Sequence, residues 1–147
     1  MTAGPPEGLP PDAAALLDDF SLFDDWEDRY AYLVDLGKRL PALPEAERTE
    51  EHKVRGCMSQ VWFVRRPDPD GRLVWDGDSD AVIVRGLIAV LAVLYRGKTV
   101  EEARNIDVEG IFNQLGLERH LSTNRRNGFH AMVARIRAWL EGDPPSV

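Results

Sequence analysis

The chain has 147 residues, the size of one ordinary globular domain, and 44% of them are hydrophobic, which is too many for a disordered protein. Its formal net charge of -7 argues against nucleic acid or an anionic membrane as a partner. A single cysteine excludes an internal disulfide and disfavours a structural zinc site, which usually needs at least two thiolates. These features predict a protein of the reducing cytoplasm without a metal site.

The N-terminal sequence MTAGPPEGLP has neither the basic start nor the apolar centre of a secretory signal. We expect a flexible tail over residues 1–10, a single domain over residues 11–142 and a C-terminal tail over residues 143–147. The most apolar stretch, residues 81–95, is interrupted by Arg85 and is shorter than the ~20 residues of a membrane span. We therefore expect no membrane segment.

The first half of the chain predicts two helices followed by a hairpin. Proline in the first turn indicates a helix over residues 11–19, and apolar residues at helical spacing indicate another over residues 24–40. The β-branched and aromatic residues of 54–66 favour a strand, and the turn at Asp70-Gly71 leads back into a strand over residues 72–76. The pattern leaves open whether the chain just before the cysteine forms a separate strand.

The middle of the chain predicts a buried helix between two end signals. Asp78 and Ser79 are typical N-caps, and Gly97 is a typical helix end. Thr99 and Glu102 then form a capping-box pattern, after which two short helices are expected. Together these elements predict an α+β fold in which a small antiparallel sheet of about three strands is flanked by helices.

The last predicted helix covers residues 124–140 and has a clear apolar stripe. The stripe consists of Phe129, Met132, Val133, Ile136, Trp139 and Leu140. Arg125 falls within this stripe and Arg126 at its edge. An arginine in the first turn of a helix opposes the helix dipole, so one that faces the core should have an anionic partner, and Asp78 or Asp80 is the candidate. A buried structural ion pair is a commoner arrangement than a functional contact.

The charges are unevenly distributed along the chain. Every charged residue up to Asp28 is acidic, whereas the segment from Arg119 to Arg137 is rich in arginine. Solvated helix faces explain such runs most simply. The alternative is an adaptor protein whose two charged regions bind partners while the cysteine only contributes to packing.

The cysteine, Cys57, lies in the run KVRGCMSQVWF. A lone cysteine is most often a buried hydrophobe, because free cysteine is among the most buried residue types. Gly56 would allow a tight, exposed turn, and Lys53 and Arg55 would lower the thiol pKa by favouring the thiolate. Ser59 and neighbouring amides could also donate hydrogen bonds to the sulfur. The residues alone leave a packed and a reactive cysteine equally open.

The segment GCMSQVWF resembles the sulfur-acceptor loop of the SufE family, which works in iron–sulfur cluster assembly. The resemblance continues in WDGDSDAVIVRGLIAVLAVLY and in LGLERHLSTNRRNGFHAMVARI. It therefore extends from about Pro11 to Leu140, in three blocks in the right order. It implies a SufE/IscU-like α+β fold, in which the acceptor loop can tuck its cysteine against an apolar pocket.

The same resemblance implies a function. Cys57 would accept sulfur from a pyridoxal-phosphate (PLP) cysteine desulfurase of the SufS type, become a persulfide and pass the sulfur to a SufBCD-like scaffold. The PLP belongs to the desulfurase, so this chain would need no cofactor and would stimulate its partner instead of acting as an independent enzyme. The resemblance does not separate SufE proper from its CsdE-type relatives. The alternative is a single-cysteine thiol redox enzyme or sensor.

Single residues refine this comparison. A second nearby thiol would resolve a persulfide into a disulfide, so a lone cysteine suits a sulfur carrier. Met58 departs from the family, which usually has glutamine at this position. Arg125 and Asp80 match family positions, and with Gly56 and Ser59 they are predicted to support Cys57 without being catalytic.

Overall fold

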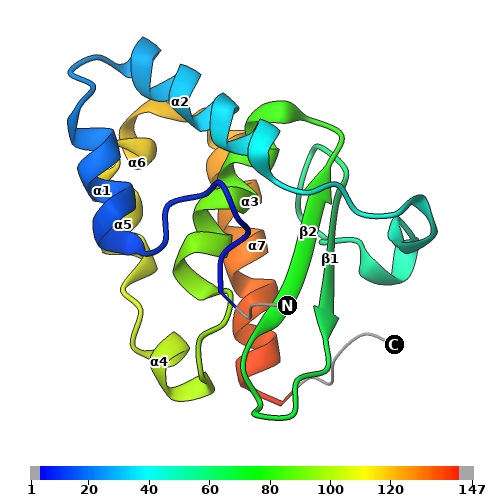
Figure 1. The fold of residues 1–147 in the computed structure, drawn as a ribbon. Helices are drawn as coiled ribbons and strands as arrows, with labels where there is room; N and C mark the ends of the chain where they lie inside the picture. The colour runs from blue at the N-terminus through cyan, green and yellow to red at the C-terminus, as the bar shows by residue number, and fades with distance from the viewer. Residues whose placement is uncertain (1–3, 143–147) are drawn as a thin grey trace.

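Two antiparallel strands, β1 (Val61–Arg66) and β2 (Val74–Ser79), form the sheet in the computed structural model, which describes residues 4–142 (Figure 1). The register pairs Val61 with Ser79 and Arg66 with Val74. The strands are joined by the predicted turn, where Gly71 adopts a positive φ of 73°. The mixed α+β class with a small antiparallel sheet is confirmed.

The sequence left open a separate strand just before the cysteine, and the structure has there only an isolated bridge between Lys53 and Trp62. One further backbone hydrogen bond joins Val54 N to the Val61 carbonyl at 2.8 Å. Gly56 then turns the chain away with a φ of +93°, so the segment is too short to form a ladder. Within residues 4–142 the small antiparallel sheet has two strands, where the sequence predicted about three.

The helices lie to one side of the sheet (Figure 1), and most of them begin and end within a few residues of the sequence signals. Their bounds are α1 (Ala13–Ser21), α2 (Trp26–Arg39), α3 (Val82–Tyr95), α4 (Val100–Arg104), α5 (Val108–Gln114), α6 (Leu117–His120) and α7 (Thr123–Leu140), with short 3-10 turns η1 (Glu45–Glu47) and η2 (Glu50–His52). Asp12, Asp25 and Ser122 cap α1, α2 and α7 through their side chains. The capping box of Thr99 and Glu102 is present at α4.

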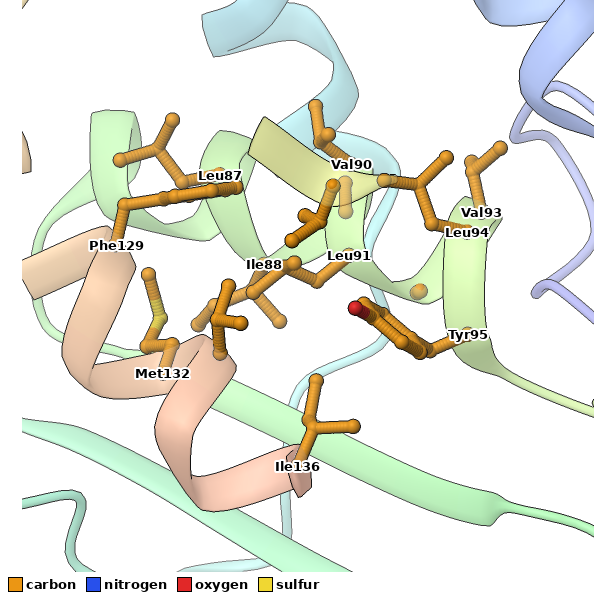
Figure 2. Packing of buried hydrophobic residues seen from close by; sticks show 14 of the residues in the cluster. Leu87, Ile88, Val90, Leu91, Val93, Leu94, Tyr95, Phe129, Met132 and Ile136 are labelled. Atoms are coloured by element: carbon orange, nitrogen blue, oxygen red, sulfur yellow. The ribbon is translucent and has the colours of Figure 1, made fainter. Parts of the chain in front are cut away.

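The core is centred on α3, which is nearly all apolar and is buried between α2 and α7. The apolar stripe of α7 faces it, as predicted. Figure 2 shows Leu87 and Ile88 of α3 near Phe129 and Met132 of α7, with Ile136 one turn further along α7. This packing holds the N-terminal half of α7 next to the first turns of α3, where the cysteine loop comes to lie.

Asp78 and Ser79 do not cap α3 as the sequence predicted, because β2 continues through both of them. The N-cap of α3 is Ala81, which has no side-chain cap. The Asp78 carboxylate is fully buried, pairs with Arg85 and with Arg48 at 2.7 Å, and accepts a hydrogen bond from Leu43 N at 2.9 Å. Asp78 thus joins β2 to α3 and to the loop after α2.

Part of the expected N-terminal tail lies against the fold. Leu9 is buried in the core, Arg39 donates to the Gly8 carbonyl at 3.1 Å, and Arg96 donates to the Gly4 carbonyl. The sequence pattern, from which we expected a flexible tail, did not indicate these contacts. Residues 1–3 and the expected C-terminal tail, 143–147, lie outside the described residues. No helix within residues 4–142 is long and apolar enough to span a membrane.

Candidate functional site

The Cys57 loop, defined here as residues 54–60, is tied down at both of its limbs. At its base Val54 N donates to the Val61 carbonyl at 2.8 Å. On the returning limb Gln60 N donates to the Asp80 carboxylate at 3.1 Å, and Asp80 N donates back to the Gln60 carbonyl at 3.3 Å. Asp80 therefore holds the backbone of the loop at Gln60.

The tip of the loop rests on α7. The Cys57 Sγ donates to the Gly128 carbonyl over 3.6 Å. A Cβ atom added to Gly128 would lie 3.7 Å from this sulfur, and one added to Gly56 would lie 3.2 Å from the Ala131 Cβ. The approach of Gly56 to Ala131 is therefore tight, whereas a Cβ atom at Gly128 would be in ordinary contact with the sulfur.

A cavity of about 340 Å³ opens beside the sulfur. It is lined by Cys57, Met58, Ser59, Val84, Leu87, Ser122, Asn124, Arg125, Gly128, Phe129 and Met132. The apolar part of the lining comes from α3, α7 and Met58 of the loop, and the polar part comes from the loop and from the N-cap and first turn of α7. Met58, the residue that departs from the family, is 80% exposed next to the thiol.

Burial raises the pKa of the Cys57 thiol. The prediction that Lys53 and Arg55 lower it is wrong, because both cations are directed to Glu50, at 3.4 and 3.3 Å. Arg55 also has 74% of its side chain exposed, so its charge is well screened by water. The resting thiol is therefore held in its protonated form.

Ser59 lines the cavity wall and gives no hydrogen bond to the sulfur among the described residues. Within residues 4–142 there is likewise no group of three or more His, Cys, Asp or Glu side chains that could hold a metal ion.

Arg125 is exposed and does not form the buried ion pair that its position in the stripe predicted. Asp78 is paired with Arg48 and Arg85, and Asp80 holds Gln60. Within residues 4–142 the Arg125 guanidinium has no ion pair or hydrogen bond. The helix begins at Thr123, so Arg125 lies in its first turn, at the cavity and beyond the edge of the core. Arg125 is the one cation among the described residues that line the cavity.

The sequence analysis missed the residues of α7 on which the loop rests. Gly128, Ala131 and Arg135 follow one another at i, i+3 and i+7, so they lie along one face of the helix. Gly128 could have been noticed, because a glycine inside a strongly periodic helix often marks a close approach. Nothing in the sequence pattern distinguished Ala131 or Arg135 from other surface positions.

These features define an α+β protein with one cysteine on a tucked loop above a mostly apolar cavity. The family description "SufE: Fe-S metabolism associated domain" matches residues 14–140. The chain belongs to the SufE family.

Relatives from two rhizobia agree with this assignment. A SufE-like protein of Rhizobium meliloti is 46% identical over 134 residues, which cover 89% of this chain and 96% of the relative. A SufE-like protein of Rhizobium etli is 50% identical over 125 residues, which cover 83% of this chain and 84% of the relative. Both are themselves described as uncharacterized.

The fold is similar to that of a solved structure, the solution structure of a hypothetical protein from Thermus thermophilus. The TM-score is 0.70, and the match covers 90% of this chain and 96% of the other. Because the two sequences are only 20% identical, this likeness supports the fold and is not used to assign a function.

Proposed function

We propose that Cys57 accepts persulfide sulfur from a PLP-dependent cysteine desulfurase of the SufS type and passes it to an iron–sulfur scaffold of the SufBCD type. The carrying observation is the position of Cys57: it lies on a loop tip, above a cavity with a largely apolar floor, in a chain of the SufE family. The PLP stays with the desulfurase, and we place the exchange in the cytoplasm.

The proposed step balances without an added oxidant or reductant. The Cys57 thiolate attacks the outer sulfur of the desulfurase persulfide, so a new S–S bond forms at Cys57. The S–S bond of the donor breaks at the same time, and its cysteine leaves as a thiolate. The proton that Cys57 gave up ends on the leaving thiolate or in solvent.

The tucked conformation suits a carrier that is inactive at rest. The raised pKa of Cys57 keeps the free protein in the thiol form, which is a poor nucleophile. Withdrawal of the loop from α7 on docking would expose the sulfur to water and return its pKa towards the ordinary value. The thiolate would then form where the donor persulfide is present.

The cavity also has room for the product. Its volume of about 340 Å³ is much larger than one additional sulfur atom needs, since a water molecule accounts for about 30 Å³ in the liquid. A persulfide that returned to this cavity would be shielded from solvent thiols, which would otherwise reduce it. The apolar side chains of α3 and α7 fit that protective role.

The test is to incubate the protein with a SufS-type desulfurase and cysteine, and then to measure its intact mass. We expect a gain of one or more sulfur atoms that a thiol reductant removes and that Cys57→Ser abolishes. Ser59→Ala is the matched control, because it changes a neighbouring residue of the cavity wall and should still load. A sulfur gain that survives Cys57→Ser would refute the assignment.

A thiol redox enzyme or sensor is the competing function. It predicts that peroxide oxidises Cys57 rapidly and that the desulfurase does not load it. The raised thiol pKa argues against it, because redox-sensing cysteines are usually low in pKa and accessible. Sulfur loading combined with slow oxidation by peroxide would decide for the carrier.

A further inference from the structure

Arg135 joins the chain leading into the Cys57 loop to the helix on which the loop rests. Its Nη1 atom donates to the Lys53 carbonyl at 3.2 Å, and its Nη2 atom donates to the Glu51 carbonyl at 3.4 Å. Both acceptors are backbone oxygens, so the guanidinium fixes the path of the main chain whatever side chains stand at these positions. Glu51 lies in the 3-10 turn η2, and Lys53 immediately precedes the loop.

The three residues Gly128, Ala131 and Arg135 act along a single face of α7. Gly128 accepts the hydrogen bond from the Cys57 Sγ, and Ala131 lies against Gly56. Arg135 is one turn beyond Ala131 and holds the carbonyl of Lys53. The chain from Lys53 to Cys57 therefore runs along α7 towards its N-terminus.

Without Arg135 the base of the loop would keep its attachments to β1 and the packing of the buried Val54 side chain in the core. The attachments to β1 are the bridge between Lys53 and Trp62 and the hydrogen bond between Val54 and Val61. On the α7 side, only the thiol contact with Gly128 and the packing of Gly56 on Ala131 would remain. A thiol is a weak donor, so these contacts alone hold the tip loosely.

We infer that Arg135 is a positioning residue that sets the balance between the tucked and the exposed position of Cys57. It does not touch the sulfur, and it acts through the backbone of residues 51–53. The inference deepens the proposed function, because it concerns how the acceptor thiol is presented. The inference is tested by alkylation of the free protein, which requires no desulfurase.

The experiment compares the alkylation of Cys57 by iodoacetamide in the full-length wild type, Arg135→Met and Arg137→Met, each over a range of pH. Methionine keeps an unbranched apolar stem and removes both hydrogen bonds. Arg137 is the matched control, because it lies on the same helix and forms an exposed ion pair with Glu109 at 2.9 Å. Thermal unfolding verifies that each variant is folded.

We expect Arg135→Met to be alkylated roughly three- to tenfold faster at neutral pH, in keeping with the modest net free energy of a partly exposed hydrogen bond. The thiol pKa read from its pH profile should fall towards the ordinary cysteine value. Arg137→Met should match the wild type. Arg135→Lys, which keeps the charge but lacks the fork that reaches two carbonyls, should be intermediate.

Two results would overturn the inference. One is alkylation of Arg135→Met within about twofold of the wild type with the same pH profile, which would give Arg135 a structural role only. The other is an equal acceleration in Arg137→Met, which would indicate general loosening of α7. Both are readings of thiol reactivity, so they are distinct from a failure of the desulfurase to load Cys57.

Discussion

The sulfur of Cys57 and the carbonyl oxygen of Gly128, 71 positions apart in the chain, lie 3.6 Å from one another. Only the protonated thiol can donate to this carbonyl. A thiolate would be repelled by the partial negative charge on the carbonyl oxygen. The contact therefore favours the thiol form, in the same direction as burial of the sulfur. It links the protonation of Cys57 to the position of its loop.

The first prediction concerns pH. Because the folded-state pKa of Cys57 is raised, the folded protein binds this proton more tightly than the unfolded chain does. The resulting stability is fully present below the ordinary cysteine pKa of about 8.5 and is lost as pH rises through the raised value. We expect the alkylation rate of the free protein to have its midpoint above about 8.5.

The matching measurement is the free energy of unfolding in urea, in the wild type and in Cys57→Ala, over the same alkaline range. The difference between the two proteins should shrink as pH rises. An alkylation midpoint at or below about 8.5 would mean that the thiol is not tucked in solution.

The second prediction concerns Gly128→Ala. The added Cβ would lie 3.7 Å from the Cys57 Sγ, an ordinary van der Waals distance, so the tucked thiol can remain. Replacing a glycine inside a helix with alanine should stabilise the fold by roughly 0.5–1 kcal/mol. The methyl group would, however, fill space beside the sulfur, where the outer atom of a persulfide would need room.

We therefore expect Gly128→Ala to unfold at higher urea concentration and to be loaded more slowly by the desulfurase, with thiol alkylation little changed. Loading at the wild-type rate would show that the persulfide does not occupy the space next to Gly128. A loss of stability would show that the loop cannot tolerate the methyl group.

The third prediction concerns Asp78, whose carboxylate is fully buried between Arg48 and Arg85. Asp78→Ala would leave Arg85 without its carboxylate partner and would free the Leu43 amide. Breaking a buried pair by removing one partner costs about 3–5 kcal/mol. We expect a loss of this size in the free energy of unfolding, measured with urea.

Asp80→Ala provides the matched control, two residues along the chain. Asp80 is exposed and accepts one hydrogen bond, from Gln60 N at 3.1 Å. Its replacement should cost no more than about 1.5 kcal/mol. Equal losses for the two variants would contradict the different burial of the two carboxylates.

Most of the helices could be predicted from the sequence, because helix ends and apolar periodicity depend on residues that are close together in the chain. Proline before α1, the apolar spacing of α2 and α7 and the capping box of Thr99 and Glu102 placed these helices to within a few residues. The junction of β2 and α3 was misjudged, since Asp78 has the chemistry of a cap but instead pairs with Arg85 and with Arg48, 30 positions earlier in the chain. The spacing of residues within one segment does not predict ion pairs with another segment.

The site was predicted in part for the same reason. A role for Cys57 was suggested by the resemblance, but its protonation depends on burial against α7, whose Gly128 lies 71 positions later in the chain. The charges of Lys53 and Arg55 suggested a lowered pKa, whereas their common partner Glu50 and the burial of the sulfur reverse that expectation. Helical periodicity likewise placed Arg125 in the core stripe without accounting for where the core ends.

The last prediction concerns Arg125, which is exposed at the cavity beside Cys57. Because it forms no buried pair, Arg125→Ala should change the free energy of unfolding by no more than about 0.5 kcal/mol. A free cation at the mouth of the cavity can attract the anionic persulfide of a donor protein. We therefore expect slower sulfur loading in Arg125→Ala, and a weaker dependence of loading on salt.

Arg126→Ala is the neighbouring control, because Arg126 donates to the Glu118 carbonyl at 3.0 Å and to Thr123 Oγ1 at 3.2 Å, and so is already engaged within the chain. Its loading should stay closer to that of the wild type, while Arg125→Lys should recover part of the rate through its charge. If Arg125→Ala instead lost about 3–5 kcal/mol of stability, the arginine would be a buried ion-pair member after all. If Arg125→Ala changed neither the stability nor the loading rate, the charge of Arg125 would have no role in sulfur transfer. Removing a cation that helps the donor to dock, or that attracts its persulfide, should slow loading.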